Sequence, residues 1–203
     1  MVFTYSSART ASLPHPSTHP GTHTAALFYM GLDKHENEQL IRTGVPTDVW
    51  FHVDSLSSAH VYLRLPSAEP ALALDDIPEE TLEDMCQLVK NNSIAGCKLA
   101  ATQVVYCFHS NLEKQLQGMD VGTVGFKDRK KCRFRKVTKD KGIVKRLEKS
   151  KALADWDYDA VKAEWVEGER LRLKAISRAR YLAENPGEAA AEPAKQKGGE
   201  GMS

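Results

Sequence analysis

The chain has 203 residues and a formal net charge of +1, from 28 Lys and Arg against 27 Asp and Glu. Hydrophobic residues make up 41% and charged residues 27%, which excludes an extensively disordered chain and leaves room for about one domain and an appendage. Because the net charge is close to zero, any argument for a polyanionic partner depends on where the charges lie. The sequence has no apolar run near the ~18 residues of a transmembrane helix and no secretory signal. We therefore expect an unexported protein without a transmembrane segment, in the cytoplasm, with the nucleus left open as a second location.

Four segments of the N-terminal half have the composition of β-strands. They lie at 1–5, 26–30, 49–54 and 59–65, and a short helix is expected between the second and the third. Residues 8–24 are rich in Pro, Ser, Thr and His, which predicts an exposed inserted loop. Prolines separate the histidines of this loop, so no helix aligns them for metal binding.

The third and fourth segments are predicted to form a hairpin with two different faces. On the fourth, alternation directs three apolar side chains toward the core: Val61, Leu63 and Leu65. His60, Tyr62 and Arg64 then project together from the opposite face. They combine hydrogen-bonding, stacking and cationic groups, so this face is the first candidate site.

One helix and two further strands follow the hairpin. Asp75 or Asp76 is expected to cap the helix, which should end near Asn91. The strands are expected at 102–108 and 121–126. Successive strands with one clear helix between them favour an α+β fold: a twisted, mostly antiparallel sheet packed by helices.

The strongest charge feature is a basic run over residues 127–136. Seven cations and one acid, Asp128, occupy these positions, with Phe134 between them. Lys and Arg bind polyanions by neutralising phosphates and releasing condensed counterions, so such a run can supply several contacts to a nucleic acid. The alternative interpretation is a solvated basic surface that only offsets the acidic helices.

The arrangement of the run depends on its secondary structure. If it is a strand, Lys131, Arg133 and Arg135 line one face and can follow a phosphate backbone. Three aromatic rings are then expected to be available for stacking on bases: Phe126, Phe134 and Tyr62.

The remaining residues predict an extension and a tail. Residues 143–184 are charged, alanine-bearing and nearly free of interruptions, which predicts a long helix whose coiled-coil character is left open. Residues 185–203 are rich in Ala, Gly, Pro, Glu and Lys, which predicts disorder. The expected plan is therefore a nucleic-acid-binding domain over 1–142, followed by this extension and tail.

The motifs of common enzymes and metal sites are missing from the sequence. The four cysteines form no C-x-x-C pair, and the chain has no Walker loop, H-E-x-x-H or G-x-G-x-x-G. Ser57, Ser58 and His60 lie close together but lack a nucleophile elbow and an orienting carboxylate. We expect no catalysis, no metal and no cofactor.

A long stretch of the chain resembles a known family. Residues 50–65, WFHVDSLSSAHVYLRL, are similar to the NFACT-R (NFACT RNA-binding) domain in its small stand-alone eukaryotic form, which carries a coiled-coil tail. The resemblance extends back to GLDKHENE and forward through NSIAGCK and MDVGTVGF to RLEKSK, and so covers roughly 26–151.

This resemblance implies an RNA- or DNA-binding α+β domain, related to one in larger proteins that engage tRNA and the ribosome during rescue of stalled translation. The family signature falls on ten residues: Asp48, Trp50, His52, Ser58, His60, Arg64, Lys98, Asn111, Lys114 and Gly122.

We thus expect a non-catalytic nucleic-acid-binding protein, with RNA (tRNA or rRNA) before DNA and with the ribosome as a further partner. The candidate nucleic-acid-binding residues are His52, Ser58, His60, Tyr62, Arg64, Lys98, Asn111, Lys114, Lys127, Arg129, Lys130, Lys131, Arg133, Arg135 and Lys136. The alternative is a protein-interaction adaptor that binds a helical partner through its C-terminal helix.

Overall fold

The computed structural model describes residues 1–5, 26–64, 73–114 and 118–186. The predicted inserted loop at 8–24 and nearly all of the predicted disordered tail lie outside these residues. Two compact units are found, Met1–Trp165 and Val166–Ser203. The first unit holds a sheet packed by helices, so the predicted α+β class is confirmed.

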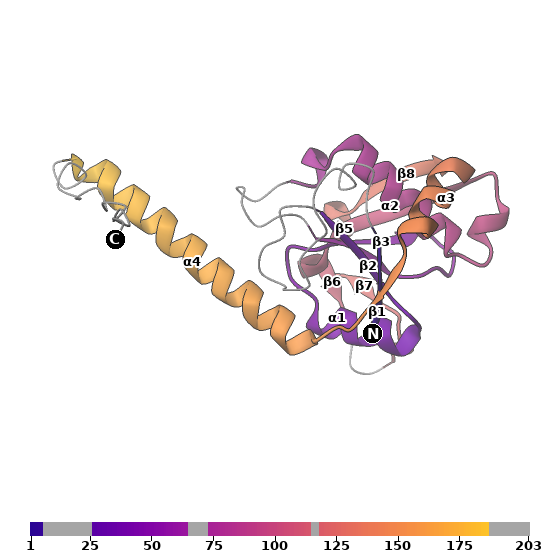
Figure 1. Cartoon of the computed structure of the whole chain (residues 1–203), viewed down its shortest axis with the longest axis horizontal. Helices are drawn as coiled ribbons and strands as arrows, with labels where there is room; N and C mark the ends of the chain where they lie inside the picture. The colour runs from indigo at the N-terminus through magenta and orange to yellow at the C-terminus, as the bar shows by residue number, and fades with distance from the viewer. Residues whose placement is uncertain (6–25, 65–72, 115–117, 187–203) are drawn as a thin grey trace, which may run out of the picture. The chain divides into compact units, whose positions relative to one another are not determined.

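Seven strands of the described residues form one antiparallel sheet in the order β8-β5-β3-β4-β2-β1-β9 (Figure 1). Their bounds are β1 (Val2–Tyr5), β2 (Leu27–Gly31), β3 (Val49–Val53), β4 (Val61–Arg64), β5 (Ala101–Phe108), β8 (Arg133–Thr138) and β9 (Ala152–Ala154). The five strands predicted before residue 110 are all present. Strand β8 is formed by the basic run and lies at one edge of the sheet, and β9 lies at the other.

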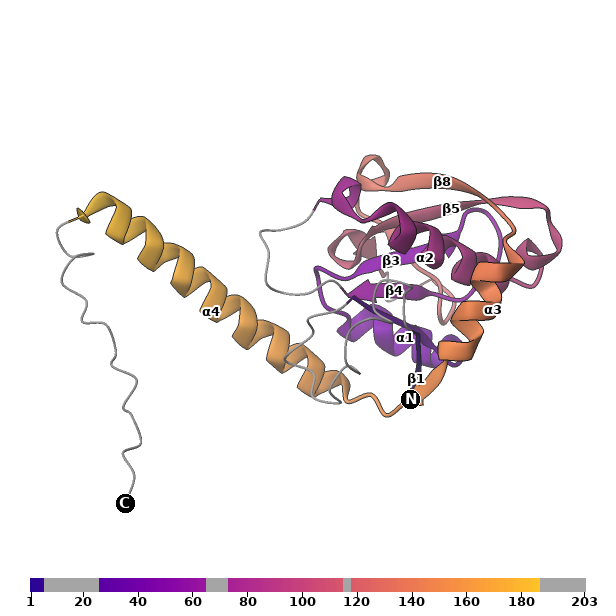
Figure 2. The ribbon, with the colours of Figure 1, turned by 45° about the horizontal axis from the view of Figure 1, so that its top comes forward.

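One face of the sheet packs against two helices, α2 (Glu79–Asn91) and α3 (Lys141–Ser150) (Figure 2). The core between these layers contains Phe51, Val61, Leu63 and Met85, all fully buried. The inward direction predicted for Val61 and Leu63 is thus confirmed, and Leu65 lies outside the described residues.

The predicted cap of α2 was wrong. The helix begins after Pro78, which occupies the N-cap position. Asp75 and Asp76 lie in a separate 3-10 turn, where the Asp76 carboxylate accepts a hydrogen bond from the backbone N–H of Ala73 at 2.9 Å. Ile77 is buried between this turn and the helix, and its burial separates the two acids from the helix start.

The opposite face of the sheet is covered by α1 (Lys34–Thr43) and by a ribbon of two short strands, β6 (Leu112–Glu113) and β7 (Gly125–Phe126). The strand predicted at 121–126 is therefore reduced to its last two residues. Gly122 has a φ of +80°, a left-handed turn conformation that ends any strand there. Its N–H donates to the Glu38 carboxylate at 3.0 Å, which ties the turn to α1.

The predicted long C-terminal helix is confirmed, but it does not run continuously over 143–184. The segment contains most of α3, then β9, then α4 (Tyr158–Glu184). Residues 152–154, Ala-Leu-Ala, favour a helix by themselves, yet they pair with β1 in antiparallel register, Phe3 opposite Leu153. Pairing with a strand about 150 positions earlier overrides the local preference, and the first unit continues to Trp165. No helix of the described residues is both long and apolar enough to cross a membrane.

Candidate nucleic-acid interface

The side chains of His60, Tyr62 and Arg64 share one face of the hairpin, as alternation predicted, but other parts of the unit cover this face. His60 is 4% exposed and Tyr62 is 0% exposed. The Arg64 side chain is 14% exposed. A second core lies between this face of the sheet, α1 and the ribbon, and it contains Tyr62 with Tyr29, Leu40 and Trp50. The Tyr62 ring is therefore not available to stack on a base.

Arg64 is held by a buried carboxylate. Its Nε and Nη2 donate to the two Asp48 carboxylate oxygens at 2.9 and 2.6 Å, and the Tyr29 hydroxyl donates to the same carboxylate at 2.5 Å. The guanidinium lies over the rings of Tyr29 and Trp156, 5.4 and 5.6 Å from their centroids. Burial lowers the pKa of Arg64, but Asp48 and Tyr29 more than offset it and keep the group charged. This arrangement stabilises the fold and leaves the guanidinium little access to a phosphate.

The polar residues of the hairpin turn also have internal partners. Trp50 Nε1 donates to Nδ1 of His60 at 2.9 Å, so the His60 ring acts as a neutral acceptor. Burial, reinforced by His52, lowers the pKa of His60 to about 3. His52 Nδ1 lies 2.8 Å from the Val53 carbonyl oxygen. The Ser58 hydroxyl accepts from the Val53 N–H at 3.0 Å and closes the turn.

Lys114 and Asn111 hold the ribbon and the start of the basic run. Lys114 Nζ lies 2.8 Å from a Glu38 carboxylate oxygen and donates to two backbone carbonyls at 2.9 and 3.0 Å. Burial raises the pKa of Glu38, yet the hydrogen bonds from Lys114 and other donors lower it to about 2. Asn111 is 7% exposed and exchanges hydrogen bonds with the backbone of Asp128 at 2.9 and 3.2 Å. The contacts of both residues therefore stabilise the fold, and neither is directed at a ligand.

The basic run divides into two groups of cations. Arg133 and Arg135 share one face of β8, as predicted, and this face turns toward the acids of α2 and of the 3-10 turn before it. Arg133 forms two hydrogen bonds with Asp75, each of 2.9 Å, and Arg135 pairs with Glu79 and Glu83. Lys131 does not share this face, because it lies before the strand in a 3-10 turn over Arg129–Lys131. These two arginines already have carboxylate partners.

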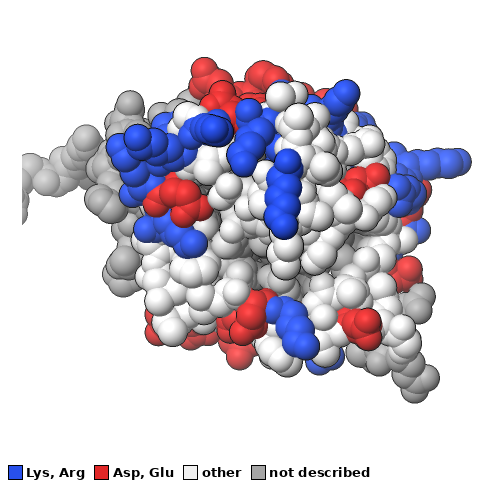
Figure 3. Space-filling model, turned by 90° about the vertical axis from the view of Figure 1, so that its right-hand side faces the viewer, with Lys and Arg blue, Asp and Glu red and all other residues white. Residues whose placement is uncertain are grey.

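The second group points away from the α2 acids. We call its members the outer basic strip: Lys127, Arg129, Lys130, Lys131 and Lys136, all exposed. Arg129 lies 3.5 Å from the Asp54 carboxylate with a side chain still 64% exposed. Of the residues that the structure describes, none forms an ion pair within 4.0 Å of Lys130, Lys131 or Lys136. On the side of the molecule where β8 and α3 lie in Figure 1, Lys and Arg gather over the upper half of the face (Figure 3).

Sequence reasoning missed two lysines that shape the end of β8. Lys139 donates from Nζ to the Cys97 carbonyl at 2.9 Å and so joins β8 to the loop that carries the exposed Lys98. Lys90 is 1% exposed, and its Nζ donates to the carbonyls of Gly96 and Leu99, both at 2.6 Å. Lys139 follows the basic run by three positions, so its place in the sequence could have predicted that it belongs to the basic surface. The role of Lys90 depends on burial, which the helical pattern alone does not reveal.

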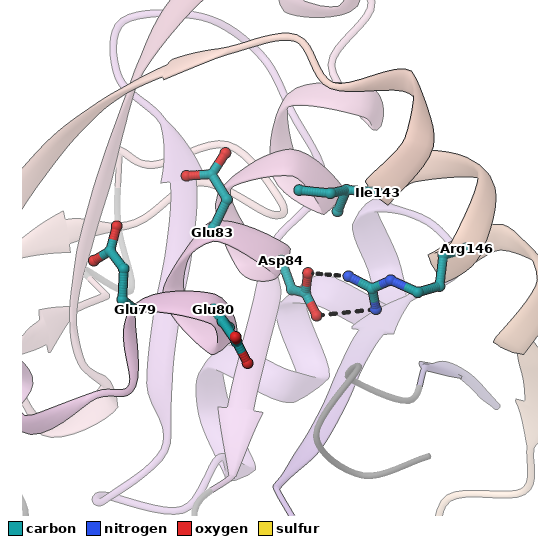
Figure 4. Close-up of a pocket in the computed structure, with 6 residues that line it drawn as sticks. All are labelled: Glu79, Glu80, Glu83, Asp84, Ile143 and Arg146. Carbon is teal, nitrogen blue, oxygen red and sulfur yellow. Dashed lines mark hydrogen bonds and ion pairs between the residues drawn. The ribbon is translucent and has the colours of Figure 1, made fainter. Parts of the chain in front are cut away.

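A groove between α2 and α3 has the opposite charge. It is lined by Glu79, Glu80, Glu83, Asp84, Ile143 and Arg146. Figure 4 shows Arg146 reaching from α3 to the Asp84 carboxylate, while the glutamates follow α2. Carboxylates in excess repel a polyanion, so this side of the sheet is unsuited to nucleic acid. The arrangement can bind a polyanion on the outer basic strip and at the neighbouring Lys98.

Comparisons with known proteins identify the family of the chain. A family model described as the NFACT protein RNA binding domain matches residues 17–128, more than half of the chain. Coiled-coil domain-containing protein 25 of Danio rerio is 49% identical over 152 residues, which are 74% of this chain and 66% of that protein. Its Dictyostelium discoideum homolog is 49% identical over 132 residues, 64% of this chain and 62% of that protein. The chain thus spans just under two thirds of the length of these relatives.

The solved structures include one with the same fold. It is the C-terminal part of the fibronectin/fibrinogen-binding protein from Streptococcus suis, with a TM-score of 0.52 and 17% identity, covering 71% of this chain and 47% of that one. At this identity the likeness concerns the fold alone. The family match, the relatives and the fold lead to one conclusion, which is that the chain belongs to the NFACT RNA-binding domain family.

Proposed function

We propose that the chain binds RNA through the outer basic strip and catalyses no reaction on it. The observation that carries the proposal is the division of the basic run. Arg133 pairs with Asp75 in the turn before α2 and Arg135 pairs with Glu83 of α2, whereas the other cations of the run are exposed. If the run served only to offset the acidic helices, its lysines would also be expected to pair with them. The family description, an RNA-binding domain, supports RNA as the ligand.

The charges fit a phosphate backbone better than a single anion. Exposed lysines follow one edge of the sheet from Lys127 through Lys136, and Lys98 continues them beyond the end of β8. Cations in such a row neutralise successive phosphates, and counterion release then gives a steep dependence of affinity on salt. The acidic groove lies on the opposite face of the sheet and disfavours binding there.

We further propose RNA of the translation machinery, tRNA or rRNA, in the cytoplasm as the ligand ahead of DNA. The family name supports RNA, and the resemblance to domains that engage tRNA and the ribosome supports this narrower choice. A phosphate backbone is common to RNA and DNA, so the basic strip gives DNA some affinity as well. A competition experiment between RNA and DNA therefore measures which of the two the chain prefers.

The test is binding of the full chain to a fluorescent tRNA and a DNA duplex of equal charge, each over a range of salt concentrations. The variant K130A/K131A/K136A should weaken tRNA binding and make the dependence on salt shallower. A matched control, K141A/K145A/K149A, removes three exposed lysines from α3, which packs on the other face. Equal losses in the two variants, or no tRNA binding at low salt, would refute the proposal. Gel analysis of the recovered tRNA tests the absence of cleavage.

The second candidate function is a protein adaptor, favoured by α4. Its C-terminal part exposes large apolar side chains: Leu171 at 52%, Leu173 at 55%, Ile176 at 52% and Tyr181 at 48%. Exposed apolar residues on one helix are typical of a surface that binds another helix. Removing residues 166–203 should leave tRNA binding intact under the first proposal. Under the adaptor function this deletion removes partner binding, and tRNA binding is weak from the start.

A further inference from the structure

One aromatic ring of the first unit lies outside the hydrophobic cores and is exposed. All of the chain's 6 Phe, 6 Tyr and 3 Trp are described, and in Met1–Trp165 only Phe134 among them is exposed, at 39%. The others lie in the two cores or are half-buried against them, except Trp165, which is half-buried and donates from Nε1 to the Thr47 hydroxyl. Phe134 also lies in the middle of the outer basic strip, two positions before Lys136 on the same face of β8.

The ring of Phe134 already carries a guanidinium on it. Arg129 Cζ lies 5.2 Å from the ring centroid, within the range of a cation–π contact. Arg129 Nη2 also lies 3.5 Å from an Asp54 carboxylate oxygen. The Arg129 side chain is still 64% exposed, so a ligand can reach it. Nucleobases stack on both aromatic rings and guanidinium planes.

Phe134 is the outermost residue of a row of cross-strand neighbours. Phe134 pairs with Val105 on β5, and Val105 pairs with His52 on β3, so the three side chains lie in one row. Val105 is 3% exposed and His52 is half-buried, so the exposed ring of Phe134 lies at the outer end of a largely covered row. The nearest members of the outer basic strip flank the row and can hold the phosphates on either side of a base.

We propose that Phe134 and Arg129 form a base-stacking subsite, which makes single-stranded RNA the preferred ligand of the outer basic strip. The inference rests on the proposed function and adds the form of RNA that is bound. In a duplex the bases are stacked on each other and their faces are closed to side chains, whereas an unpaired base can turn out onto Arg129 and Phe134. Loops, bulges and ends of folded RNA fit the same requirement.

If the subsite exists, removing the ring should lower affinity for unpaired bases without changing the salt dependence. A purely electrostatic surface would not show this separation. Phe134→Ala removes the ring without changing the charge. It should weaken binding of a single-stranded uridine 12-mer about tenfold, because a stacked base contributes on this scale. Its salt dependence should equal that of the unaltered chain. Arg129→Lys keeps the charge but loses the planar group, and should also weaken the 12-mer without changing the salt dependence.

The experiment measures fluorescence anisotropy of the full chain with three probes: the uridine 12-mer, the same strand with abasic sites throughout, and a blunt RNA duplex. Leu153→Ala is the matched control, since Leu153 is an exposed apolar residue, at 54%, on the opposite edge strand. We expect Phe134→Ala to bind the abasic strand and the duplex like the unaltered chain, and Leu153→Ala to bind all three probes like it. Thermal unfolding checks that the variants are folded.

The outcomes separate the subsite from the proposed function. If no probe binds at low salt, the proposed function fails. If the probes bind with a steep salt dependence but Phe134→Ala matches the unaltered chain on the uridine strand, RNA binding stands and the subsite is overturned. Equal loss on the uridine strand and the abasic strand also overturns it, because the ring would then support the surface and not a base.

Discussion

The hairpin face and the outer basic strip contain the same kinds of residue, cations beside aromatic rings and hydrogen-bonding groups, and the structure uses them in opposite ways. On the hairpin face Arg64 has a buried carboxylate, and His60 accepts from Trp50. On the outer basic strip Lys130 and Lys136 point to solvent. In a chain with a net charge of +1, the number of cations in a segment therefore says little about binding. Whether a cation is free to bind a ligand depends on the position of the nearby carboxylates.

The largest effect is expected on the hairpin face. Arg64→Ala leaves the Asp48 carboxylate, which is 1% exposed, without its cation. Removing one member of a buried ion pair reduces the free energy of unfolding by about 3–5 kcal/mol. Urea unfolding followed by tryptophan fluorescence measures it. Among molecules that remain folded, tRNA affinity should be unchanged, and a loss of affinity in the folded fraction would assign Arg64 to the binding surface.

A smaller loss is expected at Trp156, which lies against the same face. Its ring stacks on Tyr29 with centroids 4.7 Å apart and lies under the Arg64 guanidinium. Trp156→Ala removes an aromatic pair and a cation–π contact from a half-buried position, so we expect the free energy of unfolding to fall by about 2 kcal/mol.

Truncations sharpen this prediction. A chain that ends at Trp165 keeps β9 and Trp156 and should unfold at the same urea concentration as the full chain. A chain that ends at Lys151 loses both and should be less stable than Trp156→Ala. Equal stability of the two truncated chains would show that the strand and the tryptophan add nothing to the fold.

The buried histidines give the hairpin face a dependence on pH. Burial lowers the pKa of His60 to about 3, and it lowers the pKa of His52 and His109 as well. Between pH 6.5 and 3 the unfolded chain therefore binds a proton at His60 that the folded chain does not. The stability is fully present above pH 6.5 and declines as the pH falls, by at most about 1.4 kcal/mol per pH unit for each such histidine.

Urea unfolding at pH 7, 6 and 5 measures this slope, and His60→Asn should make it shallower. The comparison concerns slopes, because the substitution also removes the hydrogen bond from Trp50 and lowers stability at every pH. An unchanged slope would mean that His60 is protonated in the folded chain near neutral pH, contrary to its position as an acceptor.

Much of the fold followed from local pattern, because alternation and helical spacing act over a few residues. The two faces of the hairpin are of this kind. Strand β9 is different: Ala-Leu-Ala favours a helix, and only the open edge of β1 makes it a strand. Trp156 is likewise explained by Tyr29, which lies far away in the sequence.

The candidate site was predictable in composition but not in exposure. Alternation placed Tyr62 and Arg64 on one face, and nothing nearby in the sequence indicated that the face is covered. The same holds for Arg133, whose carboxylate partner is Asp75, 58 positions away. Phe134 was named as a ring that could stack, and it is exposed on the edge strand β8. Which cations remain open was therefore set by long-range partners.

The finest test compares two neighbours on β8. Arg135 turns toward Glu79 and Glu83, and Lys136 turns to the other face. Arg135→Ala should lower the free energy of unfolding by about 1 kcal/mol, as expected for a partly exposed ion pair, and leave the salt dependence of RNA binding unchanged.

Lys136→Ala should do the reverse. An exposed lysine contributes within about 0.5 kcal/mol to stability, so unfolding should not change. The slope of log affinity against log salt should fall by roughly 0.7 to 0.9, the effect of one phosphate contact. If both substitutions lower the slope equally, Arg135 leaves its carboxylates when RNA binds. The α2 acids would then compete with RNA for this arginine, and the division of the basic run would be a property of the free protein alone.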